Sequence, residues 1–285
     1  MAINKLLVIT ELDELSDKVS EFAVELAERL RHKEMILLNL IVPAHSQAFA
    51  ASGDVFQAEG DMASRFNLTL MEKHKKLVEA RAAELSTDAV EVKPYVRFND
   101  SKTDLNEYAR YFDADLILSG SRDAGTFLEK LFGSDTDKMV RKTDFPMIIL
   151  KNESETSEIR DIGLAIDVDD ENPNGIDEVI DFANALGVKL QLVHVITDKN
   201  KHTPDEAISK LRELAIAKRL KNYAINVVNN SNLEHGLRSF IRKYNPDMMA
   251  VLSQGKGKLH NLIYGSSTRD IIKETEKPVL ICKMS

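Results

Sequence analysis

Short, nearly continuous apolar runs alternate along the chain with segments whose apolar residues recur at helical spacing. In the first half these runs are predicted to be strands, and they cover Leu6–Thr10, Met35–Val42, Val90–Arg97, Leu116–Ser119 and Met147–Lys151. Continuous apolar runs are typical of parallel strands that helices cover on both faces. The alternation of strands and helices predicts βαβ units and therefore an α/β fold.

Helices are predicted between these strands. In the first half, apolar stripes at helical spacing run over Val19–Leu30, more weakly over Leu70–Leu85, and over Leu105–Phe112. The second half has a similar stripe at Ile176–Ala183, followed by a helix with Pro204 in its first turn. We therefore expect two doubly wound domains, each with a five-stranded parallel sheet and four helices. Sheets of this kind bind ligands beyond the carboxyl ends of their strands.

The two halves are an internal repeat. Three pairs of residues are separated by the same 132 positions: Asp115 and Asp247, Gly133 and Gly265, and Pro146 and Pro278. Around the second strand, MILLNLIV matches KLQLVHVI at an offset of 154, so the first half carries 22 extra residues. We place them near Pro43–Arg65 as a long loop, which is either a lid or contact surface or simply tolerated.

The domain boundary is predicted in the polar, acidic run Asn152–Glu158, which has the composition of an exposed linker. The domains are then residues 1–152 and 153–285.

Composition narrows the functional classes. The chain has 285 residues, 43% apolar and 29% charged, with a net charge of −8 and scattered cations, which disfavours nucleic-acid binding. No apolar run approaches the roughly 20 residues of a membrane span, and the N-terminus is typical of a first strand rather than a signal peptide. The single Cys282 is expected to be a buried thiol in a reducing compartment, so we expect a cytoplasmic protein. The seven histidines lack zinc-like spacing, and no metal site is predicted.

A glycine-serine motif late in each half is the most specific chemical signal. A strand ends in a loop, and about a dozen residues later a Gly-Ser pair is predicted to open a helix, at Gly133–Ser134 and at Gly265–Ser267. Glycine lets the backbone approach a phosphate closely, and the first amides of a helix are unpaired donors at the positive end of its dipole.

This pattern resembles the universal stress protein family. Its members end the fourth strand with a glycine, two residues, a second glycine, nine residues, and a glycine followed by Ser or Thr. The resemblance covers nearly all of both halves and implies a Rossmann-like, adenine nucleotide alpha hydrolase-like fold. Members that keep the pattern are associated with ATP binding, and the family also places an Asp at the end of its first strand, near the ribose and base, and a Val at the end of its second.

The first half departs from the family pattern in a way that disfavours phosphate. Asp123 stands where the second glycine belongs, and Asp135 offers a competing anion to the predicted helix terminus. We therefore regard its nucleotide site as degenerate. Its candidate binding residues are Glu11, Ile41, Gly120, Gly133 and Ser134.

The second half keeps more of the pattern. Leu252 replaces the first glycine without adding negative charge, and Lys256 and Lys258 are near enough in the chain to meet a phosphate. Its candidate binding residues are Asp167, Val195, Gly255, Lys256, Gly265, Ser266 and Ser267. ATP or a related adenine nucleotide is expected here, with Mg²⁺ only if it accompanies ATP.

A structural explanation of the same residues stays open. Gly265 and Ser266 are also typical of a strand-to-helix turn with a serine cap, Lys256 and Lys258 of a solvated loop, and Asp167 of a carboxylate that caps a local turn.

The function expected from the sequence is that of a cytoplasmic stress-response protein that acts by binding. The alternatives are an interaction module of the same fold that binds no nucleotide, and a slow ATP hydrolase. No catalytic residue is assigned, because the chain lacks a Walker-type loop, a nucleophile elbow and a paired carboxylate motif.

The last strand of each half is expected to form an internal contact. Family members commonly dimerise through these strands, so Pro146–Lys151 and Pro278–Lys283 are expected to meet within one chain as a pseudo-dimer. Edge strands this apolar should not stay exposed. A further homodimer of whole chains is also open.

Overall fold

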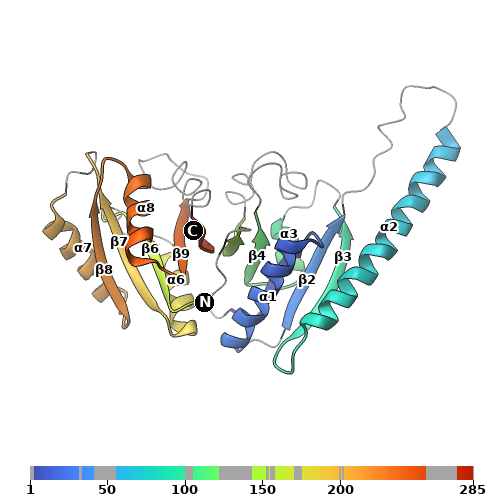
Figure 1. Cartoon of the computed structure of the whole chain (residues 1–285), viewed down its shortest axis with the longest axis horizontal. Helices are drawn as coiled ribbons and strands as arrows, with labels where there is room; N and C mark the ends of the chain where they lie inside the picture. Colours follow the sequence, from blue (N-terminus) through green and yellow to red (C-terminus); the bar gives the residue numbers. More distant parts are fainter. Residues whose placement is uncertain are drawn as a thin grey trace.

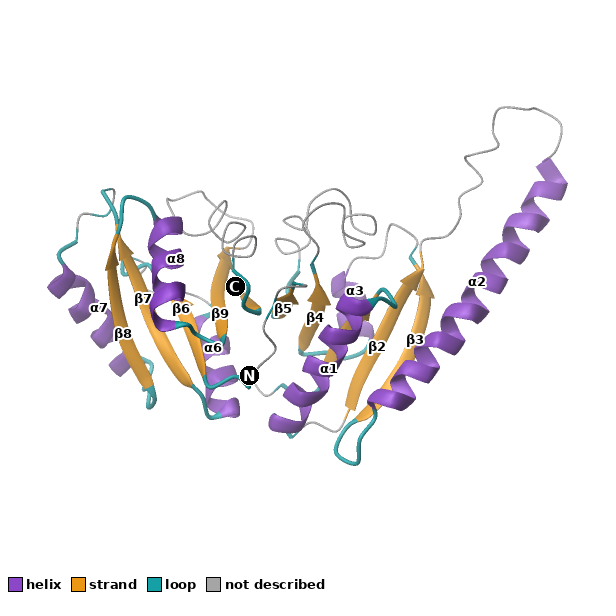
Figure 2. Ribbon diagram, viewed as in Figure 1, coloured by secondary structure: helices purple, strands orange, loops and turns teal. Residues whose placement is uncertain are grey.

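The computed structural model shows two halves that share one sheet (Figures 1 and 2). It describes residues 3–31, 34–41, 56–99, 105–121, 143–151, 154, 158–169, 175–198, 200, 202–254 and 275–284. The strands of the first half are β1 (Leu6–Thr10), β2 (Glu34–Ile41), β3 (Glu91–Phe98), β4 (Leu116–Gly120) and β5 (Met147–Leu150). Those of the second half are β6 (Asp161–Ala165), β7 (Lys189–Ile196), β8 (Tyr223–Asn229), β9 (Met248–Gln254) and β10 (Val279–Met284).

The described helices fall between these strands. They are α1 (Glu14–Arg29), α2 (Phe56–Leu85), α3 (Leu105–Tyr111), α6 (Ile176–Leu186), α7 (Pro204–Ala217) and α8 (Leu233–Tyr244). The proline predicted to open a helix does so in α7, where Thr203 and Glu206 complete a capping box. The fourth helix predicted in each half lies outside the described residues.

The strand order is that of two doubly wound domains. It runs β3-β2-β1-β4-β5-β10-β9-β6-β7-β8, and within each half every strand pair is parallel. The predicted α/β fold with a five-stranded parallel sheet in each half is therefore confirmed.

Two apolar clusters, one on each face of the sheet, explain why the strands are continuously apolar. Along β1, Leu6 and Val8 join one cluster with α1, α2, α6 and α7, whereas Leu7 and Ile9 join the other with α3 and α8. Successive side chains of a strand point to opposite faces. A strand with helices on both sides is therefore apolar on both of its faces.

The two halves join through β5 and β10. These strands pair antiparallel with Val279 opposite Ile149, Leu280 opposite Ile148 and Ile281 opposite Met147. The last strands of the two halves therefore meet within the chain, and each covers the apolar edge of the other. Cys282 of β10 is buried, which raises the pKa of its thiol.

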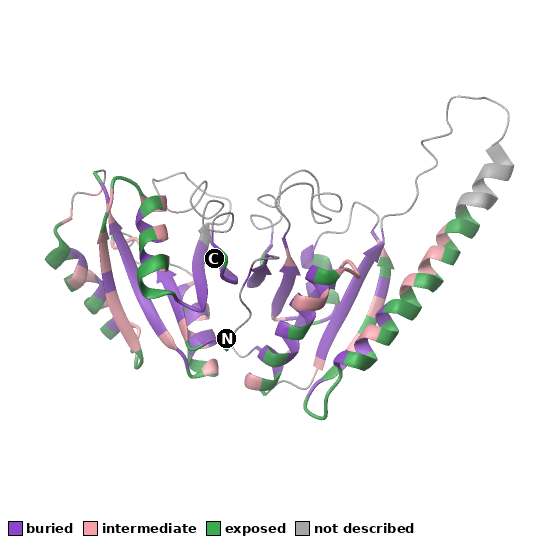
Figure 3. Ribbon diagram, viewed as in Figure 1, coloured by how far each residue is buried: buried purple, intermediate pink, exposed green. Residues whose placement is uncertain are grey.

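Helix α2 corrects the expectation of a long loop near residues 43–65. It begins at Phe56, so the last ten residues of that stretch are helical, and it has 30 residues where α7 has 14. Residues 56–65 include Gln57, Ala58, Glu59, Met62 and Ala63, which favour helix even without an apolar stripe. Figure 1 shows α2 running past the sheet, and Figure 3 shows that many of its described residues are exposed, Phe66 and Leu68 among them.

Candidate functional site

The predicted sites lie where the strand order reverses. In the first half β1 has β2 on one side and β4 on the other, and in the second half β6 lies between β7 and β9. Helix α1, which follows β1, and α3, which precedes β4, pack on opposite faces of the sheet, as do α6 and α8 in the second half. This change of side opens a crevice beyond the carboxyl ends of β1 and β6. Of the residues predicted to bind there, Glu11, Ile41, Gly120, Asp167 and Val195 are described.

In the first half a leucine occupies the space beside Gly120. Helix α1 begins directly after β1, with Asp13 as its N-cap accepting a hydrogen bond from the Ser16 N–H at 2.8 Å. This places Leu15 so close that a Cβ on Gly120 would lie 2.7 Å from Leu15 Cγ. The glycine at this position is thus accounted for by packing, and a carboxylate already caps the helix.

The other described candidates of the first half are tied into the fold. The Glu11 N–H donates to Ser16 Oγ at 2.8 Å. Ile41 is buried, and its carbonyl accepts a hydrogen bond from the Asn99 N–H at 2.8 Å.

In the second half Asp167 is half-buried at the end of β6 and caps a turn. Its Oδ1 accepts a hydrogen bond from the Asp169 N–H at 3.1 Å. Asp169 in turn contacts His202 Nε2 at 2.7 Å and Lys210 Nζ at 3.0 Å. Burial alone would raise the pKa of the Asp169 carboxyl, but the hydrogen bonds from Lys210 and His202 outweigh it and lower that pKa.

Val195 lies at the predicted strand end, and its side chain packs against α8. It is buried, and a Cβ on Gly236 of α8 would lie 2.3 Å from Val195 Cγ1. What Val195 offers to the crevice is therefore its backbone.

A buried polar residue on the second strand of each half is a feature that the sequence analysis missed. Asn39 of β2 donates from Nδ2 to the Thr10 carbonyl at 2.8 Å, and His74 of α2 contacts Asn39 Oδ1 at 2.7 Å. In β7, His194 faces the same side of the sheet as Asn39 does in β2, and its Nδ1 lies 3.0 Å from the Ile166 carbonyl. In both halves this side chain holds the end of the first strand. A polar residue inside an apolar strand is the signal that could have found each of them, although β7 also carries the buried Gln191.

His194 is held as a neutral imidazole. A carbonyl oxygen only accepts, so Nδ1 carries the proton and Nε2 is left as an acceptor. Nε2 lies 3.3 Å from Asn200 Nδ2, which donates to it. Burial lowers the pKa of His194 below its ordinary value of 6.5, against the opposing effects of the Ile166 carbonyl and Asp167.

Comparison with known proteins assigns the family. The model of the universal stress protein family matches residues 2–151 and again 158–283. The chain belongs to the universal stress protein family. The two matches show a tandem universal stress protein.

Individual relatives agree with this assignment. Universal stress protein G from Shigella flexneri is 24% identical over 136 residues, which are 47% of this chain and 94% of that protein. The protein of the same name from Salmonella typhimurium is 26% identical over the same shares of each chain. A universal stress protein from Archaeoglobus fulgidus has a similar structure, with a TM-score of 0.65, 18% identity, and coverage of 99% of this chain and 97% of that chain.

The glycine-serine motifs of this universal stress protein fall outside the described residues. They comprise Gly133, Ser134, Gly255, Lys256, Gly265, Ser266 and Ser267. In the described part of the chain no group of three or more His, Cys, Asp or Glu is placed to hold a metal ion, and no helix there is long and apolar enough to span a membrane.

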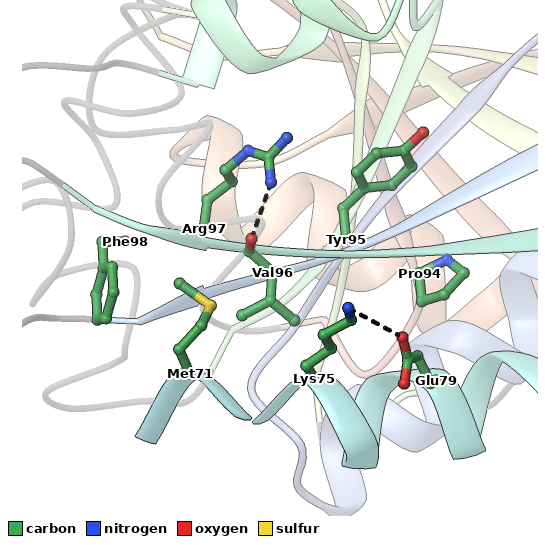
Figure 4. Close-up of a pocket in the computed structure, with 8 residues that line it drawn as sticks. All are labelled: Met71, Lys75, Glu79, Pro94, Tyr95, Val96, Arg97 and Phe98. Carbon is green, nitrogen blue, oxygen red and sulfur yellow. Dashed lines mark hydrogen bonds and ion pairs between the residues drawn. The ribbon is translucent and has the colours of Figure 1, made fainter. Parts of the chain in front are cut away.

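A groove of about 410 Å³ lies away from the strand-end crevices, at the outer edge of the sheet between α2 and β3 (Figure 4). Val96 and Met71 point into it, while Lys75 and Glu79 of α2 form an ion pair at 3.8 Å along one side. Figure 4 shows Tyr95 and Arg97 pointing to the opposite side of β3. The groove holds none of the predicted binding residues.

His194 predicts a pH dependence of stability. The unfolded histidine binds a proton below about pH 6.5, whereas the folded one resists protonation, so the unfolded state binds more protons and stability falls as the pH drops below 6.5. The slope for one proton is at most about 1.4 kcal/mol per pH unit. We expect His194→Asn, which copies Asn39 of the first half, to flatten this slope. Urea unfolding at pH 7.5 and 5.5 measures it, and a variant with the wild-type slope would contradict the assignment.

Proposed function

We propose that this universal stress protein is a cytoplasmic stress-response protein that binds an adenine nucleotide in its second half. The contrast between the two strand-end crevices carries the proposal. In the first half Leu15 packs on Gly120 and Asp13 caps the adjacent helix. In the second half α6 begins at Gly175 with no side-chain cap. Helix N-termini attract anions, and among the described residues no side chain caps this one, although its first turn carries Asp177 and Glu178.

Charge and sequence support the same half. Asp167 lies half-buried at the end of β6, where its carboxylate is available to a ribose hydroxyl. The predicted phosphate loop of this half carries Lys256 and Lys258, whereas that of the first half carries Asp123. A phosphate meets attraction in one loop and repulsion in the other.

Paired glycine variants test this proposal. Small molecules released by denaturing the purified protein are identified by mass spectrometry, and ATP binding is measured by calorimetry with and without Mg²⁺. We expect micromolar binding that Gly265→Asp weakens at least 100-fold, because it puts a carboxylate against the phosphates. Gly133→Asp, the matched change in the first half, should leave the affinity unchanged. Loss of binding in Gly133→Asp alone would move the site to the first half.

The second candidate function is that of an interaction module without nucleotide. The outer part of α2 favours it, because Phe66 and Leu68 are 56% and 64% exposed on a helix that extends past the sheet. Absence of both co-purified nucleotide and binding heat would favour this function, and an ATP hydrolysis assay separates both from slow hydrolysis.

We also propose that the pairing of β5 with β10 takes the place of a dimer interface between single-domain chains. The pairing is antiparallel and joins corresponding strands of the repeat, as a two-fold axis requires. Sedimentation of the whole chain tests whether a further homodimer forms.

A further inference from the structure

The carboxyl end of β7 presents backbone groups toward the crevice of the second half. The Ile166 N–H donates to the Val193 carbonyl at 2.9 Å, so Val193 faces β6, while the Ile196 carbonyl faces β8 and accepts from the Asn230 N–H at 3.0 Å. Alternate residues of a strand direct their backbone groups to the same neighbour. The Val195 carbonyl and the Thr197 N–H therefore face the space that β6 leaves when it ends.

The side chain of Asn200 occupies both of these backbone groups. Its Oδ1 accepts from the Thr197 N–H at 2.8 Å, and its Nδ2 donates to the Val195 carbonyl at 2.9 Å. The second Nδ2 hydrogen is donated to His194 Nε2. These three hydrogen bonds together fix the orientation of the carboxamide, with Nδ2 toward His194 and the Val195 carbonyl. Every donor of the carboxamide is used. In this arrangement the backbone groups at the edge of the crevice are closed to a ligand, because Asn200 already occupies them.

We propose that Asn200 is an internal competitor of the ligand, a side chain that must leave the Val195 carbonyl and the Thr197 N–H before a base can bind at the end of β7. The inference rests on the proposed nucleotide site of the second half. A carboxamide presents a donor beside an acceptor, and so does adenine with its 6-amino group and N1. The carboxamide and the base satisfy the same two backbone groups, so they exclude one another.

The competition sets both affinity and selectivity. A ligand that offers a donor beside an acceptor recovers the two hydrogen bonds that Asn200 gives up. A ligand that lacks one of them leaves a backbone group unpaired, which is costly in a partly buried site. Removing Asn200 leaves the groups open and raises the population of the binding-competent state.

Calorimetry with uncharged nucleosides tests the proposal, because it separates the base from the phosphates. We expect Asn200→Ala and Asn200→Ser to bind adenosine about tenfold more tightly than wild type, as release from about one to two neutral hydrogen bonds implies. Purine riboside, which lacks the 6-amino donor, should gain less. Asn230→Ala is the matched control, since Asn230 makes a local turn contact with the Ser231 N–H at 2.9 Å, and it should bind as wild type does. The amide NMR signal of Thr197 should shift on addition of adenosine.

The outcomes separate this inference from the proposed function. Tighter binding by both Asn200 variants, or binding by the variants alone, supports the inference. Equal or weaker binding by the variants overturns it and leaves the nucleotide site standing. Absence of binding by wild type and variants, for ATP as well as adenosine, overturns both.

Discussion

Replacing Leu280 with aspartate is expected to destabilise the protein by about 4 kcal/mol or more, because it combines the loss of a buried leucine with the burial of a carboxylate. Leu280 is 1% exposed and lies opposite Ile148, which is fully buried, where β10 pairs with β5. The change lies in the antiparallel pairing of β5 with β10, which joins the two halves. We expect a lower urea midpoint and, because the halves no longer support one another, unfolding in two transitions.

Leu68→Asp is the matched control for this experiment. The substitution is the same, but Leu68 is 64% exposed on the outer part of α2, so a change within about 0.5 kcal/mol is expected. Ile148→Asp should destabilise as Leu280→Asp does, and the double variant should cost less than the two single costs added, because the residues share one contact. A cost below 1 kcal/mol for Leu280→Asp would mean that the pairing does not hold the halves together.

The sheet could be predicted from the sequence because its strands are covered on both faces. Runs such as Leu6–Ile9 and Met147–Leu150 are apolar at every position, and the predicted strand bounds agree with the structure to within a residue or two. Because the two halves repeat one another, the strands assigned in the first half indicated where strands lie in the second. The start of α2 could not be predicted in the same way, since residues 56–65 form helix through their intrinsic propensity and show no apolar stripe.

The candidate binding residues that the structure describes can be compared with the sequence only by their place along the strands. Asp167 and Val195 stand at the strand ends where the family resemblance placed them. The bonds of Asn200 to Val195 and Thr197 could not be predicted, because an asparagine in a polar loop carries no periodic signal and its partners are set by the turn. The role of His194 could not be predicted for a related reason. A polar residue inside an apolar strand is common in protein cores, where its hydrogen bonds are satisfied by the surrounding backbone.

Gly236 is where a small change is expected to disturb the site most. A Cβ there would lie 2.3 Å from Val195 Cγ1 and 2.9 Å from Cγ2, well inside contact distance. Val195 is β-branched and has little rotameric freedom with which to move aside. Gly236→Ala should gain about 1 kcal/mol in helix propensity but lose more through overpacking, and Gly236→Leu should destabilise by about 3 kcal/mol. Urea unfolding measures both, with the exposed Ser239→Ala of the same helix as a control.

A compensating substitution tests whether the clash with Val195 is the cause. Val195→Ala removes both methyl groups that a Cβ on Gly236 would meet, so the double variant Gly236→Ala with Val195→Ala should be more stable than the sum of the single effects implies. Additive effects would contradict the packing explanation. Because the Val195 side chain faces α8 and only its carbonyl faces the crevice, Val195→Ala alone should lower stability yet leave adenosine affinity nearly unchanged. A large loss of affinity would instead mean that the side chain itself contacts the ligand, and that helix α8 moves when the site is filled.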